Sequence, residues 1–243
     1  EPLAFLPHGG KSYLVSRRVQ GKLLADGVSE DTLFDFMPFL FLFHTHLQRH
    51  REQLAQRGIE LTPPQYRASL HRRYVQRIHP GKRENLNHAT SFLVDLLDEE
   101  DAVLRHGDVH PRNVLKRESG FTLLDPEYLG LGPVQMDIAD LLESHRLCLP
   151  ESVVSLCVRD YYDQQPRSSF DCFYRGYAAC AAIKMLETLG SLEAHHYGMT
   201  TDELGHAKQF YRERISQRLG NLASLDSSYG DRAARLDALV ASS

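Results

Sequence analysis

Apolar residues recur at intervals of three and four over most of the chain, which is typical of amphipathic helices. The first such run, Leu33–Phe43, contains Pro38. Because proline fits the first turn of a helix, we expect a second helix from there to about Arg57. A capping-box pattern at Thr62–Gln65 begins a helix that continues to about Ile78. Further helices are predicted over Leu86–Leu97 and at about 134–148, 151–164, 169–195, 202–224 and 231–241.

Short apolar runs beside turn residues predict a few strands. Near the N-terminus, Leu3–Leu6 and Ser12–Val19 flank a turn-rich segment, and Ala102–Leu104 forms a short strand in the middle of the chain. Small residues at 178, 179, 181 and 182 predict close packing of the helix that contains them. The expected fold class is therefore α+β, with a mainly helical body.

A hairpin pattern lies between two acidic elements. Val114–Arg117 and Phe121–Leu124 flank a loop that contains glycine. If the hairpin is symmetric about Ser119, Asn113 and Asp125 lie opposite each other at its open end. Magnesium prefers oxygen ligands and commonly takes only one or two protein groups, the rest being phosphate oxygens and water. An Asn and an Asp suit that role.

The segment His106–Asn113 carries an Asp, four further residues and an Asn. This is the spacing at which the kinase catalytic loop places its base and a magnesium ligand. Together with Asp125-Pro126-Glu127 and the stretch from Gly132 to Leu142, the segment resembles the aminoglycoside phosphotransferase and choline kinase superfamily. The Asp-Pro-Glu element is similar to that of methylthioribose kinase. The resemblance implies a kinase-like fold and transfer of the γ-phosphoryl group of ATP to a hydroxyl of a small molecule, with magnesium as cofactor.

The resemblance also implies roles for individual residues. Asp108 is the expected catalytic base, and the expected magnesium ligands are Asn113, Asp125 and Glu127. Glu127 joins them because residues two apart in an extended segment point the same way.

Three further residues of the catalytic segment have weaker assignments. His106 is expected to brace the loop. His110 and Arg112 are candidate phosphate contacts, with a loop-packing histidine and a solvated arginine as the alternatives. Arg112 also departs from the glycine that is common at this position in the superfamily.

Asp137 lies at the edge of an apolar helix face. On a helix from Pro133, one face is formed by Val134, Ile138, Leu141, Leu142 and His145. Asp137 borders that face, whereas Asp140 points nearly opposite and is expected to be solvated. A carboxylate at the edge of a buried face needs hydrogen-bond donors. The matching residue in the superfamily supports the catalytic loop from below, and we expect the same of Asp137.

The N-terminal strands resemble the end of a kinase small lobe. The hinge, where backbone groups pair with adenine, is expected near residues 16–21, with candidate contacts at Ser16, Arg17, Arg18 and Val19. No Gly-rich loop and no strand lysine paired with a helix glutamate, which hold the triphosphate in kinases, precede it. We therefore interpret residues 1–28 as a remnant of the small lobe and the hinge, and residues 29–243 as the helical large lobe. The chain alone is expected to bind ATP weakly.

Composition limits the domain number, the kinds of partner and the cell compartment that we expect. The 243 residues suit one large domain or two small ones, and 42% hydrophobic content supports a sizeable core. A net charge of −4 gives no global reason to expect nucleic acid or a membrane as partner. The four cysteines show no zinc spacing, so free thiols in the cytoplasm are expected. The partner is expected to be a small hydroxyl compound.

Several alternatives remain open at this level. His44, His46 and His50 have a metal interpretation, but no carboxylate or cysteine joins them, so a structural or surface role is favoured. The basic segment from Arg49 to Arg83 is interpreted as a solvated helix face rather than an anion site. A protein kinase or a pseudokinase would keep the same loop. Candidate acceptor contacts are Asp160, Asp163 and Tyr174.

Overall fold

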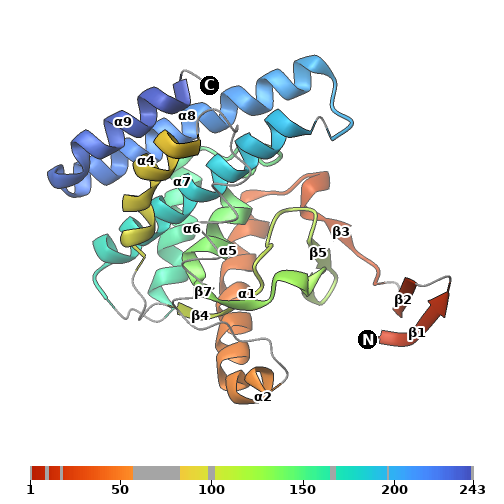
Figure 1. The fold of residues 1–243 in the computed structure, drawn as a ribbon. Coiled ribbons are helices and arrows are strands. Elements are labelled where there is room, and N and C mark those ends of the chain that lie inside the picture. Colours follow the sequence, from red (N-terminus) through yellow and green to blue (C-terminus); the bar gives the residue numbers. More distant parts are fainter. Residues whose placement is uncertain are drawn as a thin grey trace.

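The computed structural model describes residues 2–8, 11–16, 19–56, 83–97, 102–164, 168–195 and 197–241. The predicted helix at 62–78, most of the basic segment and the candidate hinge residues Arg17 and Arg18 lie outside these ranges. The fold is mainly helical with small sheets, so the predicted α+β class is confirmed (Figure 1). No helix in the described ranges is long and apolar enough to cross a membrane.

The helices account for most of the described chain. They are α1 (Glu30–Arg49), α2 (Arg51–Ala55), α4 (Arg83–Asp95), α5 (Val134–Leu142), α6 (Glu151–Asp163), α7 (Phe170–Ala194), α8 (Thr201–Leu225) and α9 (Gly230–Ala241). Short 3₁₀ turns are η1 (Leu24–Asp26), η4 (Pro126–Tyr128) and η5 (Ser227–Tyr229). The helices predicted from residue 86 onward are confirmed. The largest difference is in α5, which ends before the turns at 144–147 and the positive φ of Cys148.

The prediction of two helices around Pro38 is wrong. Pro38 lies inside α1, which begins at the N-cap Ser29 and continues without a break to Arg49. A proline in a helix interior removes one backbone hydrogen bond. Burial of one face of α1 outweighs this loss, because Phe36, Met37 and Leu40 are fully buried.

The strands form three small antiparallel sheets within the described ranges. In one sheet β1 (Pro2–His8) pairs with β2 (Lys11–Ser16), and in a second β4 (Ala102–Arg105) pairs with β7 (Gly130–Pro133). The third has the order β3-β5-β6 and comprises β3 (Lys22–Leu23), β5 (Val114–Arg117) and β6 (Gly120–Leu123). Figure 1 shows the β1–β2 hairpin extending beyond β3, away from the helices.

The hairpin β5–β6 differs by one position from the predicted register. Val114 pairs with Leu123 and Arg117 with Gly120, so the turn is Glu118-Ser119 and Asn113 lies opposite Leu124 rather than Asp125. A symmetric loop about Ser119 would need an odd number of residues, whereas the two-residue turn that forms is the common hairpin connection.

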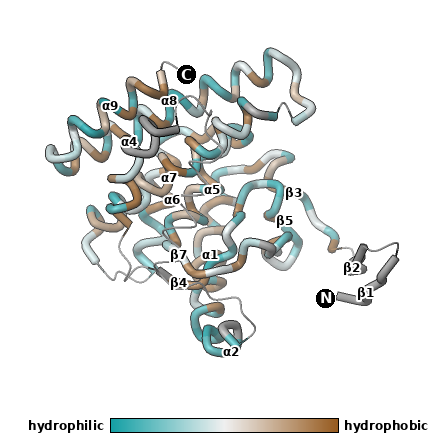
Figure 2. The backbone as a smooth tube through the Cα atoms, in the orientation of Figure 1, coloured by the Kyte–Doolittle hydropathy of each residue, from teal (hydrophilic) through white to brown (hydrophobic). Residues whose placement is uncertain are grey.

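The core lies between the long helices. Hydrophobic segments gather on the inner sides of α5, α6 and α7, with hydrophilic segments outward (Figure 2). Helix α7 packs against both α5 and α8, and its small residues are fully buried, as the sequence predicted: Ala178, Ala179, Ala181 and Ala182. At the other side, Phe36 of α1 makes an edge-to-face contact with Phe121 of β6, with ring centroids 5.1 Å apart. This contact holds the hairpin against the helical body.

Candidate active site

One buried carboxylate fixes the backbone of the loop that follows β4. Asp137 on α5 has no solvent exposure, and its oxygens accept hydrogen bonds from the backbone N–H groups of His106 at 2.8 Å and Gly107 at 2.9 Å. Arg105 Nη1 at 3.1 Å and His44 Nε2 at 3.0 Å also donate to it. Four donors therefore satisfy the two oxygens, as a buried carboxylate requires.

The environment of Asp137 keeps it ionised. Burial alone would raise the pKa of Asp137. The hydrogen bond from His44, the charge of Arg105 and the N–H of Gly107 together outweigh burial and hold the pKa well below its usual range. His44 is oriented in turn by Tyr161, whose Oη lies 2.8 Å from Nδ1. Both imidazole nitrogens of His44 are thus engaged, which leaves neither for a metal.

Gly107 is the point where the loop passes against the second acidic element. Its φ is +88°, and a Cβ at this position would overlap the carbonyl oxygen of Tyr128 in η4. Glycine tolerates both the positive φ and the close approach. The two motifs of the sequence therefore meet here, with Asp108 on one side of the contact and η4 on the other.

Asp108 and Asn113 are linked directly. Asn113 Nδ2 donates to Asp108 Oδ2 at 2.8 Å and to the Asp108 carbonyl oxygen at 3.1 Å. The Asp108 side chain keeps 24% exposure, whereas Asn113 is buried. With its nitrogen used for these bonds, the amide of Asn113 has only Oδ1 left as a ligand atom.

Asp125 is the second residue after β6 and follows Leu124, which pairs with Asn113. The N–H of Leu124 donates to the Asn113 carbonyl oxygen at 2.8 Å, so the two candidate ligands occupy adjoining positions at the open end of the hairpin. Asp125 adopts the left-handed conformation (φ 58°, ψ 67°), which Asp tolerates better than most residues, and its side chain is exposed. The backbone of Glu127 lies in η4, but its side chain falls outside the described part of the structure.

No cluster of three or more His, Cys, Asp or Glu side chains in the described ranges could hold a metal ion. The geometry offers instead one Asp and one Asn oxygen on an open edge. That donor set fits a magnesium ion that is shared with phosphate oxygens and water.

Two histidines flank the candidate base differently. His106 is buried, and this burial lowers its pKa despite the nearby Asp137 and Asp108 carboxylates. His110 is half-buried. Its Nδ1 accepts the backbone N–H of Arg112 at 3.1 Å, so its proton lies on Nε2, which faces Asp108 Oδ2 at 3.7 Å. The side chain of Arg112 is exposed.

The expectation of a solvated Asp140 is wrong. Its side chain is 7% exposed and contacts Lys184 Nζ of α7 at 2.7 Å. Burial raises the pKa of Asp140 to about 7, although the charge of Lys184 opposes this. The helical pattern placed Asp140 away from the apolar face of α5, but α7 covers that side as well.

A cleft of about 440 Å³ opens beside Asp108. Its walls come from the loop 106–113, the end of α5 with the loop after it, α7, and residues before and within α8. The candidate acceptor residues Asp160, Asp163 and Tyr174 do not line it. Its charged and imidazole side chains include Asp108, His110, Arg112, Asp140, His145, Arg146, Lys184 and Glu187. The helical spacing placed His145 on the apolar face of the predicted helix, and no spacing marks Arg146, Lys184 or Glu187. Only the packing of α7 and α8 on α5 brings these side chains to one place.

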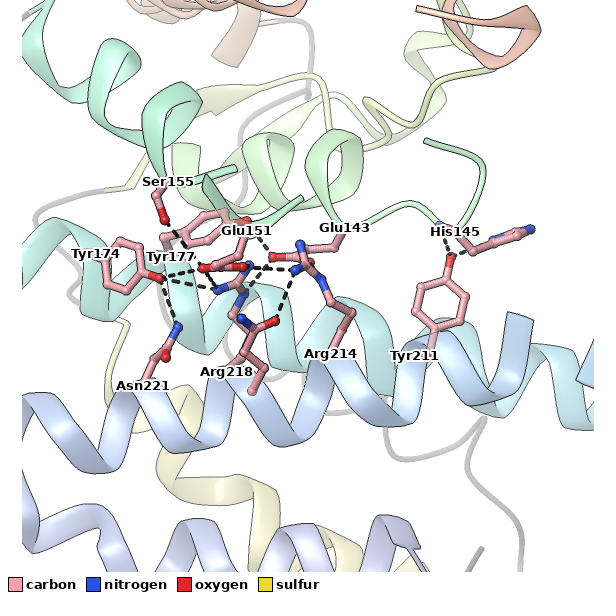
Figure 3. Close-up of polar contacts among 11 residues, drawn as sticks. Glu143, His145, Glu151, Ser155, Tyr174, Tyr177, Tyr211, Arg214, Arg218 and Asn221 are labelled. Atoms are coloured by element: carbon pink, nitrogen blue, oxygen red, sulfur yellow. Dashed lines mark hydrogen bonds and ion pairs between the residues drawn. The ribbon is translucent and has the colours of Figure 1, made fainter. Parts of the chain in front are cut away.

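A buried ion-pair network supports the wall of this cleft and joins α5, α6, α7 and α8 (Figure 3). Glu143 accepts from Arg214 Nε at 2.9 Å, from Arg218 Nε at 2.7 Å and from Tyr177 Oη at 2.6 Å. Arg218 is fully buried and also donates from Nη2 to Glu151 at 2.7 Å. Each buried charge depends on its partners for compensation, so the network fixes how α8 lies on α5.

Comparisons with known proteins agree with this fold. Residues 2–169, more than half of the chain, match the Phosphotransferase enzyme family. No curated protein matches the chain. Among solved structures, the GDP complex of aminoglycoside 2'-phosphotransferase-IIIa has a TM-score of 0.64 at 16% identity, covering 89% of this chain and 75% of that one. An aminoglycoside phosphotransferase from Alicyclobacillus acidocaldarius has a TM-score of 0.56 at 18% identity, covering 93% and 74%. The chain belongs to the Phosphotransferase enzyme family, which confirms the family resemblance of its motifs.

Proposed function

We propose that the chain transfers the γ-phosphoryl group of ATP to a hydroxyl of a small molecule. The observation that carries this proposal is the pair Asp108 and Asn113. A partly exposed carboxylate faces a cleft, and a buried amide holds it in place. The family membership supports the reaction class, and the solved relatives are named for small-molecule acceptors.

In this proposal Asp108 accepts the proton of the acceptor hydroxyl. The hydroxyl oxygen bonds to the γ-phosphorus, the bond from that phosphorus to the bridging oxygen breaks, and the nucleoside diphosphate leaves with the electron pair. Asp108 suits this role because its second carboxylate oxygen is not held by Asn113, and because the loop that carries it is fixed by Asp137. Asp137 and His106 are accordingly proposed as structural supports of the site.

Asn113 Oδ1, the Asp125 carboxylate and Glu127 are the proposed magnesium ligands. Magnesium, when bound with the nucleotide, would neutralise charge on the phosphate oxygens. The left-handed backbone at Asp125 supports this role, because strained conformations persist mainly at functional sites. His110 and Arg112, next to Asp108, are proposed contacts of the transferring phosphate.

The nucleotide base is proposed to bind at residues 16–19. Ser16 ends β2 and Val19 precedes β3, which pairs with β5 of the metal hairpin through Lys22 and Lys116. Residues 1–28 would then form the small-lobe strands and the hinge, and residues 29–243 the large lobe. The pairing of β3 with β5 supports this division, because it joins the segment that follows the proposed hinge to the hairpin that begins after Asn113.

The test is transfer of labelled phosphate from γ-³²P-ATP with magnesium to a panel of hydroxyl compounds by the full-length protein. We expect product with the parent protein and a kcat that is lower by about 10² to 10⁴ in Asp108→Asn, with an unchanged melting temperature. Asp163→Asn, which lies outside the cleft, is the matched control.

Two results would contradict the proposal. Full activity of Asp108→Asn would place the base elsewhere. Binding of magnesium nucleotide without transfer to any acceptor, from either ATP or GTP, would favour a binding module that has kept the kinase fold.

A further inference from the structure

The cleft beside Asp108 contains two guanidinium groups that no described carboxylate neutralises. Arg112 lies in the loop 106–113 and Arg146 lies in the loop after α5. Both side chains are exposed, and both line the cleft. Neither makes an ion pair in the described structure. The pKa of Glu203 at the start of α8 is lowered mainly by hydrogen bonds that its carboxylate accepts from Thr200 in a capping box. The charge of Arg146 lowers this pKa to a smaller extent.

The other charges that line the cleft are already paired. Lys184 contacts Asp140 at 2.7 Å and Glu187 at 3.4 Å, and Glu143 is held by Arg214 and Arg218. The uncompensated charges of the cleft are therefore the two arginines and Asp108. A ligand that fills the cleft therefore meets one carboxylate and two guanidinium groups whose charges no other described side chain compensates.

His145 adds a hydrogen-bond donor next to Arg146. Tyr211 Oη accepts the backbone N–H of His145 at 3.4 Å and lies 2.9 Å from His145 Nδ1. Tyr211 is buried, and Nδ1 is the only acceptor near its hydroxyl among the described residues, so the phenol donates its hydrogen to Nδ1. The imidazole proton then resides on Nε2, which points away from Tyr211 (Figure 3).

His145 follows Glu143 and Ser144 in the loop after α5 and lines the same cleft as Arg112 and Arg146. Burial lowers the pKa of His145, and the charges of Arg146 and Arg112 lower it further. His145 therefore offers an N–H to the cleft without adding a charge near pH 7.

We propose that Arg146, assisted by the Nε2–H of His145, binds an anionic group of the acceptor, so that the acceptor is a hydroxyl compound carrying a carboxylate or a phosphate ester. This inference rests on the proposed function. A guanidinium matches the two oxygens of such a group with paired hydrogen bonds, and an unpaired one repels a cationic acceptor. The acceptor's hydroxyl would then reach Asp108 while its anionic group is held at the other side of the cleft.

The test uses four compounds with one carbon skeleton and different charge: glucose 6-phosphate, gluconate, glucose and glucosamine. Their binding to the full-length protein, loaded with magnesium and a non-hydrolysable ATP analogue, is measured by calorimetry. We expect the two anionic compounds to bind at least about tenfold more tightly than glucose and glucosamine. Arg146→Gln should weaken binding of the two anionic compounds about tenfold, which corresponds to ~1.4 kcal/mol, and leave binding of glucose unchanged. Arg117→Gln, an exposed arginine outside the cleft, should change nothing.

The outcomes separate the sources of the anion. If Arg146 binds the donor phosphates instead, Arg146→Gln weakens binding of the ATP analogue and glucose 6-phosphate competes with it, which overturns the assignment to the acceptor. Equal or tighter binding of glucose or glucosamine relative to both anionic compounds also overturns it. The proposed function fails separately, when anionic compounds bind through Arg146 and yet no compound receives phosphate.

Discussion

Asn113 donates a hydrogen bond from Nδ2 to Oδ2 of Asp108 across 2.8 Å. The candidate base and a candidate metal ligand are thus one unit, five positions apart in the chain. The bond fixes the amide so that Oδ1 is its free acceptor, and it leaves the other oxygen of Asp108 for an acceptor hydroxyl. A change at Asn113 should therefore affect both proton transfer and metal binding.

The first prediction separates these two effects. Asn113→Ala should lower kcat and raise the magnesium concentration needed for half-maximal activity, whereas Asp125→Ala should abolish metal-dependent nucleotide binding. The reason is that Asp125 supplies a charged ligand and Asn113 a neutral one. Calorimetry with ATP, with and without magnesium, checks this, and Glu118→Ala at the hairpin turn is the control. If both variants bind magnesium nucleotide like the parent, the metal site lies elsewhere.

The second prediction concerns Gly107. Gly107→Ala should destabilise the fold and impair activity, because the new Cβ overlaps the Tyr128 carbonyl in addition to the strain of a positive φ. Strain of this kind alone costs about 1–3 kcal/mol. Gly120→Ala is a matched control, since Gly120 also has a positive φ (113°) but no atom near the position of a Cβ. Urea denaturation should show a clearly larger loss for Gly107→Ala; equal losses would mean that the contact with Tyr128 does not restrict the loop.

The third prediction concerns the ion-pair network behind the cleft. Arg218→Met should lower the free energy of unfolding by about 3–5 kcal/mol, because it leaves the buried Glu143 with less compensation. The double variant Arg218→Met with Glu143→Gln should recover part of this loss, since the uncompensated charge is gone. Arg232→Met, exposed on α9, is the control for the loss of an arginine. Denaturant titration measures all three, and no recovery in the double variant would show that packing rather than charge sets the loss.

Much of the fold could be predicted because helical periodicity is a local property of the chain. The helices α4 to α9 follow directly from the spacing of their apolar residues. Pro38 was misinterpreted, because local propensity disfavours proline inside a helix while the buried face of α1 decides the outcome. The hairpin register was wrong by one position for a similar reason, since a two- or three-residue turn cannot be chosen from composition alone.

The site was only partly predictable. The catalytic segment is contiguous in sequence, so Asp108 and Asn113 could be chosen by spacing. The cleft is built from the ends of α5, α7 and α8, and Lys184, His145 and Arg146 come together in its walls only through helix packing. The pairing of Asp140 with Lys184 likewise depends on α7 covering the side of α5 that its own periodicity marks as exposed.

The fourth prediction follows from Asp140, whose pKa burial raises to about 7 in the folded protein. Because this value lies above the ordinary value of 3.8, the protonated carboxyl is the form that the fold favours. Its contribution to stability is fully present below about pH 4 and is lost as the pH rises through 7. Asp140→Asn resembles the protonated form and lacks this loss.

The free energy of unfolding of Asp140→Asn should therefore rise relative to that of the parent between about pH 5 and pH 8, by at least the order of 1.4 kcal/mol that one pKa unit represents. Thermal unfolding across this range measures the difference, with Asp163→Asn, an exposed carboxylate, expected to follow the parent throughout. The contrary result would be a loss of stability of Asp140→Asn relative to the parent as the pH rises. It would mean that the attraction of Lys184 lowers the pKa of Asp140 by more than burial raises it, so that Asp140 is ionised at neutral pH.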